Sequence, residues 1–190
     1  MPDTKDETKQ RDGHSYMTLL MTPDMVNFSG NIHGGALLKL LDLAAYACAS
    51  HYSQQYVVTL SVDQVQFYEP VYVGELVTFK SRINYVGNSS MEVGVEVWAE
   101  NIHTGEERFT SNCFITMIAV GDDGRPVKIQ PLKLVTIQDK AQFVEAKLRK
   151  QLRAEHGRRL ADLHEKWSDH VEDLTQEEIE MELDRAMTEA

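Results

Sequence analysis

The feature that most constrains the fold is the segment 36–51, which is apolar almost all round when drawn as a helix. Its alanine and leucine content favours a helix over a strand. Because it has no polar face, such a helix has to be buried. A carboxylate, Asp42, stands near its middle, and burying a carboxylate without a partner is costly. An ion pair with Lys39 or a packing contact would explain Asp42, and so would a catalytic role.

Several other segments carry the patterns of β-strands. Residues 76–85 and 91–100 alternate between apolar and polar side chains, which indicates strands with one face toward solvent. The apolar face of 76–85 is predicted to hold Val77, Phe79, Ile83 and Tyr85, and the wet face of 91–100 to hold Glu92, Glu96 and Glu100. The predicted strands span 14–21, 57–68, 76–85, 91–100 and 108–120.

The order of these elements predicts an α+β fold: a strand, the buried helix, then four antiparallel strands. A sheet with one apolar face must cover that face, and the helix is the obvious cover. We therefore expect a five-stranded antiparallel sheet wrapped around a central helix. One sheet can enclose only part of a helix, so an apolar flank is left for a second copy, and we expect a dimer.

The predicted domain organisation has three parts. We expect a disordered N-terminus over 1–13, one domain over 14–130 and a helical C-terminal extension over 131–190. The extension is predicted to contain a charged helix over 139–167, interrupted at Gly157, with an apolar stripe from Val144 to Trp167. That stripe has to be buried, either on the outer sheet face or between dimers. A capping box over 175–178 predicts a last helix with Ile179, Leu183 and Met187 on its apolar side.

Composition excludes several classes of function. The formal net charge is −11 and no basic patch is visible, so a nucleic-acid binder is not expected. No apolar run approaches the ~20 residues of a membrane span, and the charged N-terminus lacks a signal region, which predicts a cytoplasmic protein. The two cysteines, Cys48 and Cys113, lie in apolar segments and are predicted to be reduced core residues. Without C-x-x-C or paired histidines, no metal site is expected.

The loop before the predicted helix contains the second candidate for chemistry. It runs from Asn27 to the sequence His33-Gly34-Gly35. Glycines beside a helix N-terminus let a ligand approach the backbone N–H groups, where the helix dipole favours negative charge. An oxyanion hole is built in this way.

Together, Asn27, His33-Gly34-Gly35 and Asp42 resemble the hotdog-fold acyl-CoA thioesterases, both the bacterial acyl-CoA hydrolase and the phenylacetyl-CoA thioesterase-like branches. The resemblance continues through 57–63, 67–75 and 86–93 and covers roughly 15–130, but not the C-terminal helices. It implies a hotdog fold and hydrolysis of acyl-CoA to a carboxylic acid and coenzyme A. It implies no cofactor beyond the coenzyme A of the substrate, and a homo-oligomer, either a dimer or a trimer of dimers.

The resemblance also implies catalytic roles. Asp42 would be the general base for water or the nucleophile that attacks the thioester. Asn27, supplied by the partner subunit, would position water or substrate. A backbone N–H of Gly34 or Gly35 would polarise the thioester carbonyl.

Further contacts are implied around this centre. His33 would orient the substrate. Thr59 and Ser61, which we place on one strand face, offer a hydroxyl to the attacking water. For coenzyme A, the turn at 87–90 resembles the family's phosphate- or pantetheine-contacting loop, and its residues are Gly87, Asn88, Ser89 and Ser90. Arg82 is a possible charge partner of coenzyme A, as are Lys80 and Arg108.

Three other functions compete with hydrolysis. A hotdog hydratase or dehydratase pairs an acid with a histidine, but His51 lies nine residues after Asp42, about two and a half turns away. A non-catalytic acyl-CoA-binding protein would lack the Asp or the Asn, and this chain has both. A purely structural unit leaves Asp42 unexplained unless Lys39 pairs with it.

Overall fold

The computed structural model describes residues 12–168 and 175–181. Most of the segment predicted to be disordered, residues 1–11, lies outside the described residues. Leu183 and Met187 of the last predicted helix also lie outside them. The chain divides into two compact units between Ala146 and Lys147. The first unit holds the sheet, α1 and the first turns of α2.

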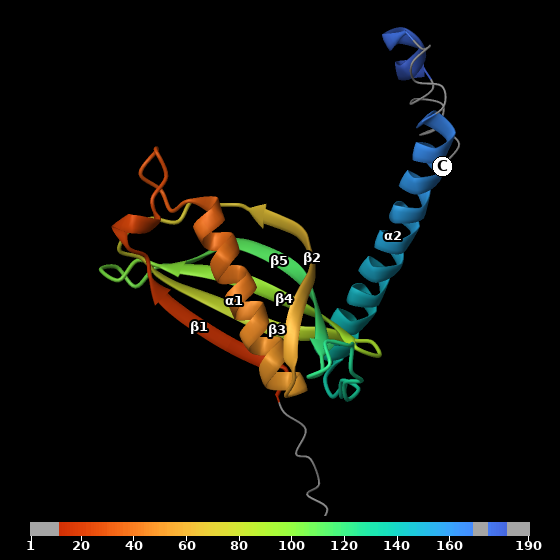
Figure 1. The fold of residues 1–190 in the computed structure, drawn as a ribbon. Coiled ribbons are helices and arrows are strands. Elements are labelled where there is room, and N and C mark those ends of the chain that lie inside the picture. The colour runs from red at the N-terminus through yellow and green to blue at the C-terminus, as the bar shows by residue number, and fades with distance from the viewer. Residues whose placement is uncertain (1–11, 169–174, 182–190) are drawn as a thin grey trace, which may run out of the picture. The chain divides into compact units, whose positions relative to one another are not determined.

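A curved antiparallel sheet wraps around one long helix, α1 (Figure 1). Its five strands lie in the order β1-β3-β4-β5-β2, so β1 and β2 form its edges. The predicted fold and order of elements are confirmed. The elements are β1 (His14–Leu20), the 3-10 turn η1 (Pro23–Met25), α1 (Gly34–Ser53), β2 (Tyr56–Phe67), β3 (Leu76–Val86), β4 (Ser90–Glu100), β5 (Glu107–Val120) and α2 (Ile137–Ser168).

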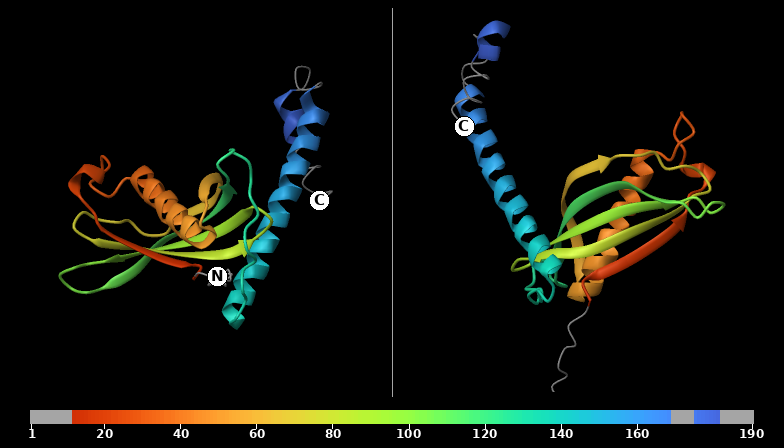
Figure 2. Two further views of the ribbon diagram at one scale, coloured as in Figure 1. Left: turned by 60° about the horizontal axis from the view of Figure 1, so that its bottom comes forward. Right: turned by 180° about the vertical axis from the view of Figure 1, so that it is seen from behind.

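Both views of Figure 2 show α1 against the concave face of the sheet. The hydrophobic core lies between them. Leu41 and Ala45 of α1 are fully buried there, together with Phe79 from the sheet. Cys48 and Cys113 are free, buried thiols in the same core, as predicted. Burial raises the pKa of each thiol to about 12, so neither forms a thiolate near neutral pH.

One flank of α1 is not covered by its own chain. Leu38, Leu43 and Tyr46 are each more than a third exposed. The expectation of a helix buried on every side is therefore wrong for a single copy. The uncovered flank agrees with the argument that one sheet can enclose only part of the helix.

A β-bulge changes the predicted faces of β3. The register with β4 shifts between Ile83 and Tyr85, so Ile83 pairs with Val93 while Tyr85 pairs with Glu92. The placement of Tyr85 on the apolar inner face is therefore wrong, because the extra residue, Asn84, moves it to the outer face. There its ring lies 5.2 Å from that of Phe143.

The outer face of the sheet is also less wet than predicted. Glu92 is only 3% exposed, and Asn84 Nδ2 donates to its Oε1 over 3.4 Å. The first turns of α2 cover this region, where Asp139 forms an ion pair with Arg82 and Ala146 is fully buried. Glu92 thus lies in a polar layer under α2 rather than in solvent.

Helix α2 runs without a break from Ile137 to Ser168. The predicted interruption at Gly157 is therefore wrong. The helix propensity of the neighbouring residues outweighs the cost of one glycine. Val144, Leu148 and Leu152 of the predicted stripe are more than half exposed in the single chain. The surface that covers the stripe remains a prediction.

The capping box over 175–178 is confirmed. Glu178 N donates to Thr175 Oγ1 over 3.4 Å, and Thr175 N donates to Glu178 Oε2 over 2.8 Å. The described helix after it covers 176–181.

Gly157→Ala is expected to stabilise the protein. No heavy atom lies within 4 Å of a Cβ built on Gly157, and alanine in a helix interior is worth about 0.5–1 kcal/mol over glycine. Thermal unfolding followed by circular dichroism measures the change. Gly94→Ala is the opposite control, because its Cβ would lie 2.6 Å from Asn84 Nδ2 in the polar layer. A Gly157→Ala protein that melts below wild type would contradict an unstrained helix there.

Candidate active site

Asp42 lies on the third turn of α1 and points toward β2. Thr59 Oγ1 on β2 donates to Asp42 Oδ1 over 2.6 Å, and the same hydroxyl lies 3.4 Å from Met117 Sδ. The side chain of Asp42 is partly buried rather than enclosed. Within the described residues no ion pair joins Lys39 to Asp42, so that explanation of the carboxylate does not hold. The carboxylate is fixed in place by one hydroxyl and keeps an accessible oxygen.

Thr59 and Ser61 do not share a face of β2. The register with β5 shifts between them, so Thr59 pairs with Met117 while Ser61 pairs with Thr116. Paired residues in an antiparallel sheet point to the same side. Since Met117 belongs to the inner core, Thr59 lies on the side of Asp42 and Ser61 lies on the outer side. The predicted common face is wrong because Leu60 is the extra residue of a bulge.

The two candidate glycines at the N-terminus of α1 differ in the hydrogen bonding of their backbone N–H groups. The ring of His33 is the N-cap, and its Nδ1 accepts a hydrogen bond from Gly35 N over 2.8 Å. That N–H is therefore engaged. In the part of the chain that the structure describes, no hydrogen bond is recorded for Gly34 N. Gly34 is thus the backbone donor that can reach a substrate oxygen, while the predicted substrate contact of His33 stays a prediction.

Asn27 lies in a narrow loop, 26–32, that projects beyond the N-terminal end of α1 (Figure 1). Its Oδ1 accepts from Ser29 N and Asn31 N over 2.9 and 3.2 Å, which fixes the side chain within the loop. Gly30 closes the tip with a φ of +82°, a conformation that suits glycine. Phe28 at this tip is fully exposed. Sequence reasoning passed over Phe28, although an aromatic residue between Asn and Ser-Gly was a visible signal.

The base of this loop is held by a partly buried ion pair. Arg108 Nη1 and Nη2 bind the two carboxylate oxygens of Glu75, both over 2.9 Å. Glu75 Oε2 also accepts from Tyr72 N, and Val71 O beside it accepts from Ile32 N over 2.8 Å. Arg108, considered as a charge partner for coenzyme A, is therefore committed to positioning the chain under the loop.

One chain cannot bring Gly34 and Asp42 to the same thioester. The two residues are eight positions apart on α1, which is about 12 Å at 1.5 Å per residue. An oxyanion donor and a base or nucleophile each need to be ~3 Å from the reacting group. The half-site around Asp42 therefore requires a donor from elsewhere, and an identical helix in a second copy offers one.

The predicted coenzyme A turn is a tight hairpin between β3 and β4. Gly87 N donates to Ser90 O over 2.7 Å. The carbonyls of Asn88 and Ser89 accept from Ile129 N and Ala119 N, both over 2.9 Å. Side chains and the remaining N–H groups are what this turn can offer to a ligand.

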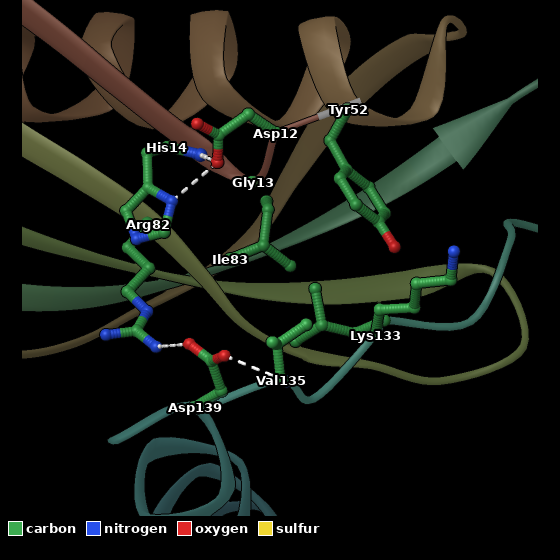
Figure 3. A pocket seen from close by; sticks show the side chains of 10 residues that line it. Asp12, Gly13, His14, Tyr52, Arg82, Ile83, Lys133, Val135 and Asp139 are labelled. Atoms are coloured by element: carbon green, nitrogen blue, oxygen red, sulfur yellow. Dashed lines mark hydrogen bonds and ion pairs between the residues drawn. The ribbon is translucent and has the colours of Figure 1, made fainter. Parts of the chain in front are cut away.

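Arg82 precedes the inward-facing Ile83 on β3 and so lies on the outer side of the sheet, where Figure 3 shows it beside Asp139. It pairs with Asp139 in a cavity of about 350 Å³, which is also lined by Tyr52 and by an ion pair between His14 and Asp12 at 2.6 Å. The structure does not bring Arg82 to the carboxylate of Asp42. Its contact with coenzyme A remains a prediction.

Among the residues that the structure describes, no group of three or more His, Cys, Asp or Glu side chains is placed to hold a metal ion. No helix in the same residues is long and apolar enough to span a membrane.

A five-stranded antiparallel sheet wrapped around one long helix is the hotdog fold. Residues 29–106 match the family model described as the thioesterase superfamily. The chain is 42% identical over 151 residues to Protein VdlD of Helicobacter pylori, which covers 80% of this chain and 83% of that protein. It therefore belongs to the thioesterase superfamily.

Other relatives carry acyl-CoA names. The cytosolic acyl coenzyme A thioester hydrolase of Rattus norvegicus is 30% identical over 130 residues, which is 67% of this chain but only 34% of that protein. A solved hexameric acyl-CoA thioesterase has a TM-score of 0.74 at 32% identity, over 76% of this chain and 93% of that one. An acyl-CoA hydrolase from Bacillus cereus has a TM-score of 0.72 at 29% identity, over 80% and 94%.

Thr59→Val is expected to lower thioester hydrolysis about tenfold or more, the loss expected for one hydrogen bond to a charged group. Thr59→Ser keeps the hydroxyl and should retain most of the activity. Ser61→Ala is the matched control, because Ser61 lies on the other face of the sheet. Steady-state thiol release measures all three. Equal losses in Thr59→Val and Ser61→Ala would contradict the assignment of Thr59 alone to the site.

Proposed function

We propose that the protein hydrolyses acyl-CoA thioesters to a carboxylic acid and coenzyme A, at sites completed by two copies of the chain. The observation that carries the proposal is the Asp42 carboxylate, fixed by Thr59 beside an uncovered apolar flank of α1. The acyl-CoA thioester hydrolases among the relatives support the same reaction. These relatives do not support the two alternatives, a hydratase or dehydratase and a non-catalytic acyl-CoA-binding protein.

The reaction uses groups of this chain only. Asp42 takes a proton from water or attacks the thioester carbon directly. The carbonyl oxygen becomes negative as the bond to the nucleophile forms, and Gly34 N–H of a second copy stabilises it. Collapse of this intermediate expels the thiolate of coenzyme A. In the general-base route the thiolate takes up the proton held by Asp42 and the carboxylic acid is released. In the nucleophilic route an acyl–Asp42 anhydride is left, and water hydrolyses it to the carboxylic acid and free Asp42. No step requires a cofactor beyond the coenzyme A of the substrate.

The arrangement of the two copies is dictated by symmetry. In a two-fold dimer every contact is reciprocal, so Gly34 of each copy must be level with Asp42 of the other. Two parallel helices offset by eight residues cannot satisfy both contacts, whereas two antiparallel helices can. Edge strand β2 has no neighbour beyond it among the described strands, and Leu60 and Val62 on it are exposed. Pairing of two β2 edges would join the sheets and place the α1 helices side by side.

The assembly and the cellular location extend this proposal. A trimer of dimers has six copies, which agrees with the hexameric relative of known structure. A cytoplasmic location is supported by the cytosolic name of the rat relative.

Asp42→Asn is expected to reduce hydrolysis by a factor of ~10² or more, because it removes the base or nucleophile. The amide can still accept from Thr59, so circular dichroism and size-exclusion profiles should match wild type. Thiol release from acyl-CoAs of graded chain length provides the assay. Near wild-type rates in Asp42→Asn would remove this carboxylate from the mechanism.

Mixing two inactive variants is expected to restore activity if the site is shared. In a heterodimer of Asn27→Ala with Asp42→Asn, one site keeps both native residues and the other loses both. Random exchange in equal amounts should restore about a quarter of the wild-type rate. Exchange is verified by two affinity tags. No recovery in verified heterodimers would mean that each copy has a self-contained site.

A further inference from the structure

The loop tip at Phe28 is a rigidly built apolar projection. Two side-chain hydrogen bonds to Asn27, the bridge of Val26 with Ile32 and the turn at Gly30 hold its shape. Phe28 is nevertheless fully exposed in the single chain. The loop therefore holds an apolar ring in a fixed position, where a second copy of the chain can contact it.

A second aromatic feature lies beside the carboxylate. Tyr46 comes one turn of α1 after Asp42, and its ring meets that of Tyr56 at 6.4 Å, edge to face. Both tyrosines are more than a third exposed. The pair therefore forms a partly open aromatic surface about 6 Å along the helix from Asp42.

The reciprocal dimer brings these two features to the same level. With Gly34 of one copy beside Asp42 of the other, the chain that precedes Gly34 continues toward Tyr46 of the second copy. Figures 1 and 2 show that the 26–32 loop extends past the start of α1. The exposed ring of Phe28 then meets the Tyr46–Tyr56 pair of its neighbour.

The coenzyme A turn lies at the same end of the sheet. Ser90 pairs with Ile118 on β5, and Ile118 pairs with Val58 on β2, two residues after Tyr56. Ser89 O also accepts from Ala119 N, next along β5. A substrate that spans from Asp42 to this turn therefore passes the tyrosine pair.

We propose that Phe28 of one copy packs on Tyr46 and Tyr56 of the second copy and forms an aromatic wall along the pantetheine arm of the substrate. This inference rests on the proposed function and on the predicted role of the 87–90 turn. The amides and methyl groups of a pantetheine arm suit aromatic faces, which offer contact area at little cost in side-chain entropy. The wall recognises the part of the substrate that all acyl-CoAs share, so it governs affinity for coenzyme A and not the choice of acyl chain.

The first test compares substrates with and without the pantetheine arm. Phe28→Ala and Tyr46→Ala should each lower kcat/KM about tenfold for acetyl-, hexanoyl- and palmitoyl-CoA alike, in the range of single aromatic contacts at interfaces. The corresponding N-acetylcysteamine thioesters, which lack most of the arm, should be hydrolysed as by wild type. The Kd for free coenzyme A, from calorimetry, should rise by the same factor. Tyr16→Ala, an exposed tyrosine on β1, should change nothing.

Equal losses on both substrate classes, or an effect that varies with acyl length, would overturn the inference. Absence of thiol release by the wild-type protein from every thioester would refute the proposed function, and this inference with it.

The second test asks which copy supplies Phe28. In tagged heterodimers of Asp42→Asn with Asn27→Ala, the single intact site combines the loop of the Asp42→Asn copy with the carboxylate of the other. Phe28→Ala placed in the Asp42→Asn copy should reproduce the tenfold loss. The same substitution in the Asn27→Ala copy should have no effect. The reverse pattern would show that Phe28 acts within its own copy and would overturn the proposal.

Discussion

The rigid length of α1 is the constraint on which the rest of the active site depends. A helix cannot bring its first residue to a side chain more than two turns along, so Gly34 and Asp42 of one copy cannot act on the same thioester. The fold leaves one flank of α1 and the β2 edge of the sheet uncovered, and the proposed second copy fits there. The Glu75–Arg108 ion pair fixes the base of the 26–32 loop, which in the proposed dimer has to reach the second copy.

Much of the fold could be predicted from local patterns. The apolar segment around Leu41 predicts a buried helix, and the alternation around Val93 and Val95 predicts strands, because burial on one side leaves a periodic trace in the sequence. Asp42 could be singled out because a charge in such a helix requires a reason, and its hydroxyl partner Thr59 was among the expected contacts.

The errors have a common physical origin in irregular backbone and long-range pairing. Bulges at Leu60 and Asn84 reverse the faces of Ser61 and Tyr85, yet apolar and polar residues continue to alternate through them without a visible break. The Arg82–Asp139 pair joins residues 57 positions apart, which no local pattern reveals. His33 could have been recognised as a helix cap from its place before the two glycines, but the choice between Gly34 and Gly35 depends on the direction of one ring nitrogen.

The exposed edge of β2 has a consequence for how enzyme kinetics would be interpreted. When a site exists only between two copies, the concentration of working sites depends on the association equilibrium of the chain. A polar substitution at Leu60 or Val62, which touch no reacting group, would then reduce the active fraction of the enzyme. Its signature is a lower maximal velocity at an unchanged Michaelis constant, recovered when the protein is concentrated. The measured rate therefore reports the association equilibrium of the chain as well as the chemical step.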